Sequence, residues 1–181
     1  MQQAGCARLT CADPYDEVIV FASASINFSD KRAGYRELEN QLRALLTGER
    51  DAIANLANTA ALVFYALPDL NWAGFYRLIG NELVLGPFHG RPACVRIPVG
   101  KGVCGTTVAR CETVLVRNVH EFPGHIACDA ASHSEIVVPL MHQGRALGVL
   151  DLDSPTLGRF DADDQAGLER LAAVLVAATD W

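Results

Sequence analysis

The chain has 181 residues, of which 50% are hydrophobic and 20% are charged, a composition that fits one well-cored globular domain and excludes a disordered chain. Its formal net charge of −6 argues against a nucleic-acid partner, because binding to phosphate backbones requires a basic face. The sequence shows no apolar run near the roughly 20 residues of a membrane span and opens without the apolar stretch of a signal peptide. We therefore expect a soluble, cytoplasmic protein with no membrane partner.

The first part of the chain predicts two helices that follow an N-terminal extension. Residues 1–30 have no helical period, and we expect them to be a poorly ordered extension. From Tyr35 onward leucines recur at helical spacing, and this first helix is expected to end near Gly48. A second, alanine-rich helical period begins at Ile53, and Pro68 stops it.

After Asn71 the pattern changes to short runs of aromatic and branched residues, which are typical of strands. The expected strands are residues 72–78, 82–86, 94–97, 113–116, 134–140 and 146–153. Gly80 and Asn81 accept positive φ and predict a hairpin between the first two strands, and residues 142–145 predict another between the last two.

Two further helices are expected around these strands. A short one spans residues 102–110 after two glycines, and the chain closes with a helical period over 161–178 that Asp161 can cap. The order of elements predicts an α+β fold: one antiparallel sheet of about six strands with helices packed on one face.

Cysteine is the first residue type that could carry chemistry. Cys94, Cys104 and Cys128 lie in the sheet region, where a cysteine is commonly a small buried hydrophobe. Cys128 differs, because its neighbours, including His125, are too polar and broken for a core strand and predict a loop that can present a reactive thiol. His125 or a following helical turn could stabilise the thiolate. Cys111 has no such context.

A zinc site is the competing explanation of the same cysteines. Structural zinc usually draws on paired ligands such as C-x2-C, and the spacings from Cys94 to Cys104 and from Cys104 to Cys128 contain no such pair. We therefore expect no metal.

Three acidic residues form a second group of interest. Asp151 and Asp153 lie two apart in a predicted strand, so their side chains share one face while Leu150 and Leu152 share the other. Glu135 begins the strand expected to pair with this one. The three groups form either a solvated acidic edge or a confined pocket in which mutual repulsion raises a pKa and a cationic ligand is favoured.

Two aromatic residues form the third group. Trp72 and Tyr76 share a strand face with Gly74, which would leave an open space between the two rings. The rings either pack in the core or flank a gap that holds a methyl, thioether or cationic group.

These residues lie in four stretches that together are distinctive. They read NWAGFY (71–76), LVLGPFHGRPACVRIPVGKGVCGT (83–106), FPGHIACDAASHSEIVVPL (122–140) and GVLDLDS (148–154). Over about residues 35–178 the sequence closely resembles the free methionine-(R)-sulfoxide reductases, single-domain members of the GAF superfamily. The resemblance implies a GAF-like fold and a single catalytic domain over residues 31–181.

The resemblance also implies a role for each candidate residue. It makes Cys128 the catalytic cysteine, Cys94 the principal resolving cysteine and Cys104 a second recycling cysteine. The substrate-binding residues that it implies are Trp72, Tyr76, Glu135, Asp151 and Asp153.

The expected reaction is reduction of free L-methionine-(R)-sulfoxide through sulfenic acid and disulfide intermediates. A thioredoxin-type reductant would regenerate the thiols, without metal or cofactor, and members of this family are commonly homodimers. A non-catalytic GAF module that binds a small ligand or senses oxidants is the alternative.

Overall fold

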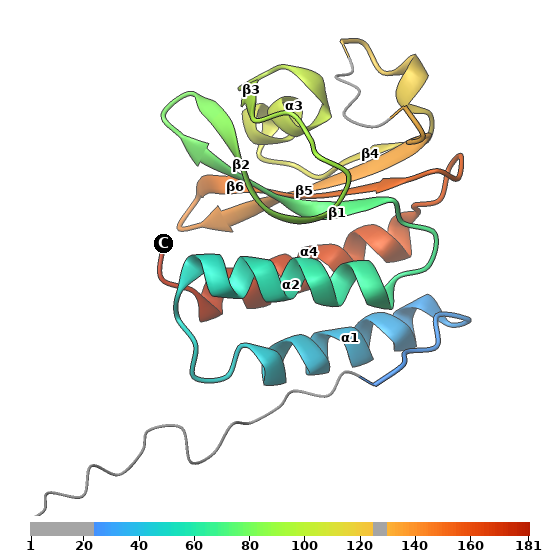
Figure 1. Ribbon diagram of the computed structural model, residues 1–181, viewed down its shortest axis with the longest axis vertical. Helices are drawn as coiled ribbons and strands as arrows, with labels where there is room; N and C mark the ends of the chain where they lie inside the picture. Colours follow the sequence, from blue (N-terminus) through green and yellow to red (C-terminus); the bar gives the residue numbers. More distant parts are fainter. Residues whose placement is uncertain (1–23, 125–129) are drawn as a thin grey trace, which may run out of the picture.

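Figure 1 shows the computed structural model, which describes residues 24–124 and 130–181. Within these residues six strands form one antiparallel sheet in the order β3-β2-β1-β6-β5-β4. The strands are β1 Trp72–Ile79, β2 Glu82–Gly90, β3 Arg96–Pro98, β4 Val114–Val116, β5 Ser134–His142 and β6 Arg145–Ser154. The helices are α1 Lys31–Leu45, α2 Ala52–Ala66, α3 Gly102–Arg110 and α4 Ala162–Ala178, with one 3-10 turn at Val119–Glu121. The predicted α+β architecture is confirmed.

The long helices begin at aspartates whose carboxylates accept hydrogen bonds from the first turn. Asp30 accepts from the Ala33 N–H at the start of α1, and Asp51 accepts from the Ala54 N–H at the start of α2. Asp161 caps α4 as predicted, and its backbone N–H donates to the Asp164 carboxylate, which completes a capping box. Helix α1 begins four residues before the leucine period that predicted it, because the Asp30 cap rather than hydrophobic spacing sets its first turn.

Both predicted hairpins are present, and two of the sequence-based strand limits need correction. β2 continues to Gly90 through Gly86 and Pro87, because beyond Val84 it pairs with β1 while its pairing with β3 has ended, and proline is tolerated where a ladder bond is not required. β3 begins only at Arg96, so Cys94 lies in the loop before it rather than in a strand.

The two faces of the sheet carry different layers. Helices α2 and α4 pack on one face, and α1 packs beneath them (Figure 1). Side chains of Phe75, Leu150 and Leu152 fill the core on this face. The short helix α3 lies on the opposite face, over β5 and β6 (Figure 1), where a second core contains Val137 and Val149. The expected position of helices on one face is therefore met by the three long helices, and α3 covers the other.

Residues 24–30 run along the helical layer as an irregular segment. Ile26 and Phe28 pack against the core between the helices, and Phe28 meets the Tyr35 ring edge to face. The rest of the predicted extension, residues 1–23, lies outside the described residues. None of the helices described has the length and apolar character that crossing a membrane would require.

Candidate active site

The acidic residues singled out from the sequence meet on the face of the sheet that α3 covers. Glu135 of β5 lies directly opposite Asp153 of β6, and Asp151 lies two residues earlier on β6. Leu150 and Leu152 point into the core on the helical face, as strand alternation requires. The strand pairing and alternation expected from the sequence therefore bring three carboxyl groups to one place.

Two of these carboxyl groups are buried. Glu135 and Asp151 each expose only 6% of their surface, and charged groups pay a large desolvation penalty at such positions. Burial raises the pKa of Glu135 well above its ordinary range, and the neighbouring charges of Asp151 and Asp153 raise it further. Burial also raises the pKa of Asp151, to about 7, although hydrogen bonds from Cys104 and Glu135 oppose the shift. The cluster therefore retains protons near neutral pH.

Helix α3 brings a cysteine into the same cluster. The Cys104 thiol donates a hydrogen bond to Oδ2 of Asp151, with 3.3 Å between sulfur and oxygen. Only 3% of Cys104 is exposed, and burial, followed by the charges of Asp151 and Glu135, raises the pKa of its thiol well above the ordinary value. The thiol is therefore neutral in this state and acts as a hydrogen-bond donor.

The same three residues are spaced closely enough to share a metal ion. One ligand atom each from Cys104, Glu135 and Asp151 lies within 4.8 Å of the other two. Clustered protein acids also occur as proton-sharing groups without a metal, so this spacing alone does not identify a metal site. We assign the cluster as a set of hydrogen-bonding and titrating groups.

Aromatic side chains border the acidic cluster on β1. Trp72 and Tyr76 are both buried on the α3 face, and their ring centroids lie 6.0 Å apart. The indole N–H of Trp72 donates to the carbonyl oxygen of Arg91 at 3.1 Å, which fixes the ring. Trp72 and Asp153 are direct cross-strand partners, so the aromatic residues and the carboxyl groups belong to one site.

The space expected above Gly74 is occupied. A Cβ at Gly74 would lie 2.3 Å from Cβ of Phe88 and 2.7 Å from Cη2 of Trp72, so the absence of a side chain admits these neighbours rather than leaving a gap. Phe88 stacks on Trp72 with a centroid separation of 5.3 Å. Sequence reasoning missed Phe88 because its position opposite Gly74 depends on the pairing of β2 with β1.

The cysteines predicted to react are not all described. Cys94 is half-buried in the loop before β3 and packs against the core on the α3 face. Cys104 joins the acidic cluster, and Cys111 is exposed just after α3. Cys128 and its neighbour His125 lie outside the described residues, so their expected roles remain predictions.

The chain is anchored beside the site just after residues 125–129. The side-chain amide of Asn71, next to Trp72, donates to the hydroxyl of Ser132 at 3.0 Å. One residue later, the His133 N–H donates to the carbonyl oxygen of Ser154 at 2.8 Å. The chain that follows Cys128 in sequence therefore enters the sheet next to Trp72 and Asp153.

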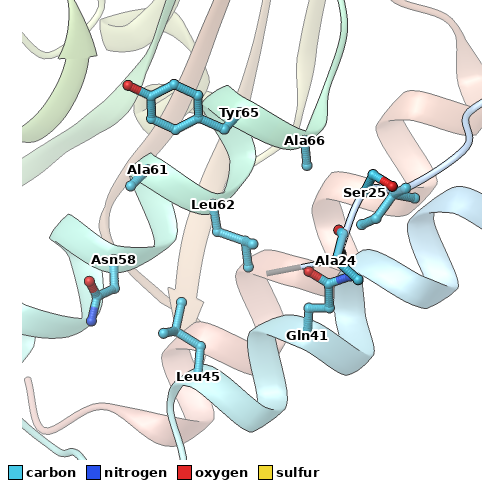
Figure 2. Close-up of a pocket in the computed structure, with 10 residues that line it drawn as sticks. Ala24, Ser25, Gln41, Leu45, Asn58, Ala61, Leu62, Tyr65 and Ala66 are labelled. Carbon is cyan, nitrogen blue, oxygen red and sulfur yellow. Dashed lines mark hydrogen bonds between the residues drawn. The ribbon is translucent and has the colours of Figure 1, made fainter. Parts of the chain in front are cut away.

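A separate pocket lies on the helical side of the molecule. Figure 2 shows it between α1, α2 and residues 24–26, with Leu62 on α2 facing Gln41 on α1. Its volume is about 510 Å³. Its lining includes none of the candidate site residues, and α1 and α2, which form it, lie on the side of the sheet opposite α3 (Figure 1).

Comparison with known proteins places this architecture in a family. The family model described as "GAF domain" matches residues 39–180. This chain belongs to the GAF domain family. Among its GAF relatives, the free methionine-R-sulfoxide reductase of Escherichia coli strain K12 is 53% identical over 155 residues, which cover 84% of this chain and 94% of the relative.

Two solved GAF structures are also close to this one. The X-ray structure of the free methionine-R-sulfoxide reductase of Neisseria meningitidis in complex with its substrate has a TM-score of 0.84 at 46% identity, and the match covers 88% of this chain and 95% of that one. A candidate GAF sensor protein from Burkholderia vietnamiensis has a TM-score of 0.78 at 57% identity, with 80% and 92% covered. The family resemblance drawn from the sequence is thus confirmed.

Proposed function

We propose that the chain is a reductase that converts free L-methionine-(R)-sulfoxide to L-methionine. The observation that carries the proposal is the buried acidic cluster next to stacked aromatic rings, on the face of the sheet opposite the long helices. Such a site offers carboxylates to an α-ammonium group and ring faces to a methyl thioether. The reductases from Escherichia coli and Neisseria meningitidis, which share about half of their residues with this chain, support the same reaction.

In the proposed reaction the thiolate of Cys128 attacks the sulfoxide sulfur, and oxygen passes from the substrate to the cysteine. Methionine leaves as a thioether, and Cys128 becomes a sulfenic acid, so two electrons move from the thiol to the substrate. Glu135 holds a proton because of its raised pKa and can hydrogen-bond the sulfoxide oxygen as its charge grows. No step requires a metal.

Recycling completes the cycle with thiols. The thiol of Cys94 condenses with the sulfenic acid, releases water and forms a disulfide with Cys128. A thioredoxin-type dithiol then reduces the disulfide and is itself oxidised. Cys104 takes the secondary role in recycling. Its buried thiol has a raised pKa and therefore forms a thiolate less readily than an ordinary cysteine does.

Asp151 and Asp153 give the proposed enzyme its selectivity for the free amino acid. A methionine sulfoxide inside a peptide lacks the α-ammonium group that these carboxylates would bind, so it leaves them unpaired. We expect peptide-bound and N-acetylated methionine sulfoxide to be poor substrates.

We also propose that the chain forms the homodimer that is common in this family. Light scattering after size-exclusion chromatography would detect it.

The test is an assay for methionine formation from the free (R)-sulfoxide with thioredoxin or dithiothreitol. The unsubstituted chain should turn over repeatedly, and Cys128→Ser should form no methionine. With thioredoxin as the reductant, Cys94→Ser should form about one equivalent of methionine per chain and then stop, because it cannot form the disulfide that thioredoxin reduces. Cys111→Ser is the matched control, because Cys111 is exposed and outside the site. Repeated turnover by Cys128→Ser would refute the assignment of the nucleophile.

A sensor that binds a small ligand without catalysis is the second candidate. The candidate GAF sensor protein from Burkholderia vietnamiensis, which is 57% identical to this chain, supports this second candidate. The same assay separates the two functions. Binding of the free sulfoxide without methionine formation by the unsubstituted chain would favour the sensor.

A further inference from the structure

The two oxygens of the Asp151 carboxyl group have different surroundings. Oδ2 accepts the hydrogen bond from the Cys104 thiol, and Glu135 also hydrogen-bonds the Asp151 carboxyl group. Oδ1 is buried and has no hydrogen-bond partner among the residues described. A buried acceptor without a partner is costly, and native proteins rarely keep one without a function.

The backbone holds Cys104 firmly above Asp151. Helix α3 approaches the end of β3 so closely that a Cβ at Gly105 would lie 2.4 Å from the carbonyl oxygen of Pro98. The Gly100 N–H donates to the carbonyl oxygen of Gly105 at 2.8 Å and ties the preceding loop to the helix. The thiol therefore reaches Asp151 from a rigid element, which suits a group that orients another.

We propose that Cys104 is a positioning residue, whose thiol fixes Oδ2 of Asp151 and thereby directs Oδ1 toward the α-ammonium group of the substrate. This inference rests on the proposed reductase function. It gives Cys104 a role in the reduced enzyme before any thiol has been oxidised. A role in recycling, in contrast, begins only after the first methionine has formed.

The test measures binding of free L-methionine-(R)-sulfoxide by calorimetry to the full chain carrying Cys128→Ser, in which no turnover occurs. Adding Cys104→Ala removes the donor and should weaken binding about tenfold or more, as expected when a hydrogen bond to a charged group is lost. Adding Cys104→Ser keeps a donor at the same position and should restore affinity to within about threefold. Thermal unfolding of each variant verifies that it is folded.

A double-mutant cycle keeps the test decisive if Cys104→Ala is less stable. In a chain that also carries Asp151→Asn, Cys104→Ala should weaken binding by less than about twofold, because the carboxylate that it orients is already absent. A purely structural role would lower stability in both backgrounds and affect binding by the same factor in each.

Three results would overturn the inference. Equal affinities in the parent, alanine and serine chains would show that Cys104 does not position Asp151. Equal losses in folded alanine and serine chains would show that hydrogen bonding is not its contribution. If the unsubstituted chain neither binds nor reduces the free sulfoxide, the proposed function is wrong and the positioning role is wrong with it. If the Cys128→Ser parent binds the sulfoxide but the Cys104 variants do not behave as expected, only the role of Cys104 is wrong.

Discussion

The two faces of the sheet are built from alternate residues of the same strands but follow different rules. On the helical face, Leu150 and Leu152 pack against α2 and α4 with no exposed surface. On the α3 face, Asp151 is buried almost as deeply as its two leucine neighbours, and its pKa is displaced to about 7. One face lowers the free energy of the folded chain by apolar burial, and the other keeps ionisable groups at a cost in stability.

The largest expected effect comes from comparing adjacent residues on the two faces. Leu150→Ala should lower the free energy of unfolding by about 2–5 kcal/mol, because it opens a cavity in the core. Asp151→Asn should leave that free energy at pH 8 unchanged or higher, because a buried charge is replaced by a neutral group of similar shape, yet it should greatly weaken substrate binding. Urea denaturation and calorimetry measure the two quantities.

The comparison fails if the two substitutions destabilise the chain equally. The α3 face would then contribute to stability as the helical face does. The substitutions serve as each other's controls, because folded Leu150→Ala should bind the substrate like the unsubstituted chain.

A smaller effect is expected in the pH dependence of stability. The raised pKa, about 7 against an ordinary 3.8, means that folded Asp151 binds its proton more tightly than the unfolded chain does, so its contribution to stability is lost as pH rises from about 4 to 7. The slope from one such group is at most about 1.4 kcal/mol per pH unit. Glu135 on β5 acts in the same direction.

Urea denaturation across this pH range tests the prediction by difference. The groups described around Asp151 include Cys104 from α3, Glu135 from β5, and Asp153 on the same strand. Subtracting the profile of Asp151→Asn from that of the unsubstituted chain removes the titration of distant residues. A difference that grows more favourable to the unsubstituted chain as pH rises would contradict the assignment.

The smallest effect belongs to Cys111, which lies beyond the end of α3. Its thiol is exposed, so Cys111→Ser should change the free energy of unfolding by no more than about 0.5 kcal/mol. Methionine formation should also be unchanged. A loss of turnover in this variant would show that Cys111 takes part in recycling.

Sequence patterns predicted the helical face better than the α3 face. Periodicity located the helices that cover Leu150 and Leu152, because each pattern depends on local spacing. The alternation of Asp151 and Asp153 with these leucines predicted that the carboxyl groups share a face, since a strand has a period of two.

The contacts within the site could not be predicted in this way. The position of Phe88 opposite Gly74 depends on how β2 pairs with β1, and the bond from Cys104 to Asp151 depends on how α3 crosses the sheet. The first contact depends on a register shift within the β1–β2 hairpin, and the second joins residues that are 47 positions apart in sequence. The resemblance of the whole motif set to a family supplied the candidate residues that periodicity alone left undecided.

The pairing of β1 with β6 at the centre of the sheet also bears on how the site forms. Trp72 lies opposite Asp153 and Gly74 lies opposite Asp151, although the two hairpins that contain them are widely separated along the chain. Contacts between residues so far apart in sequence require the closure of a long loop, which costs conformational entropy, and they form slowly. During synthesis, the aromatic residues of β1 are therefore made before the acidic residues of β5 and β6. The site can assemble only when the C-terminal part of the chain has emerged.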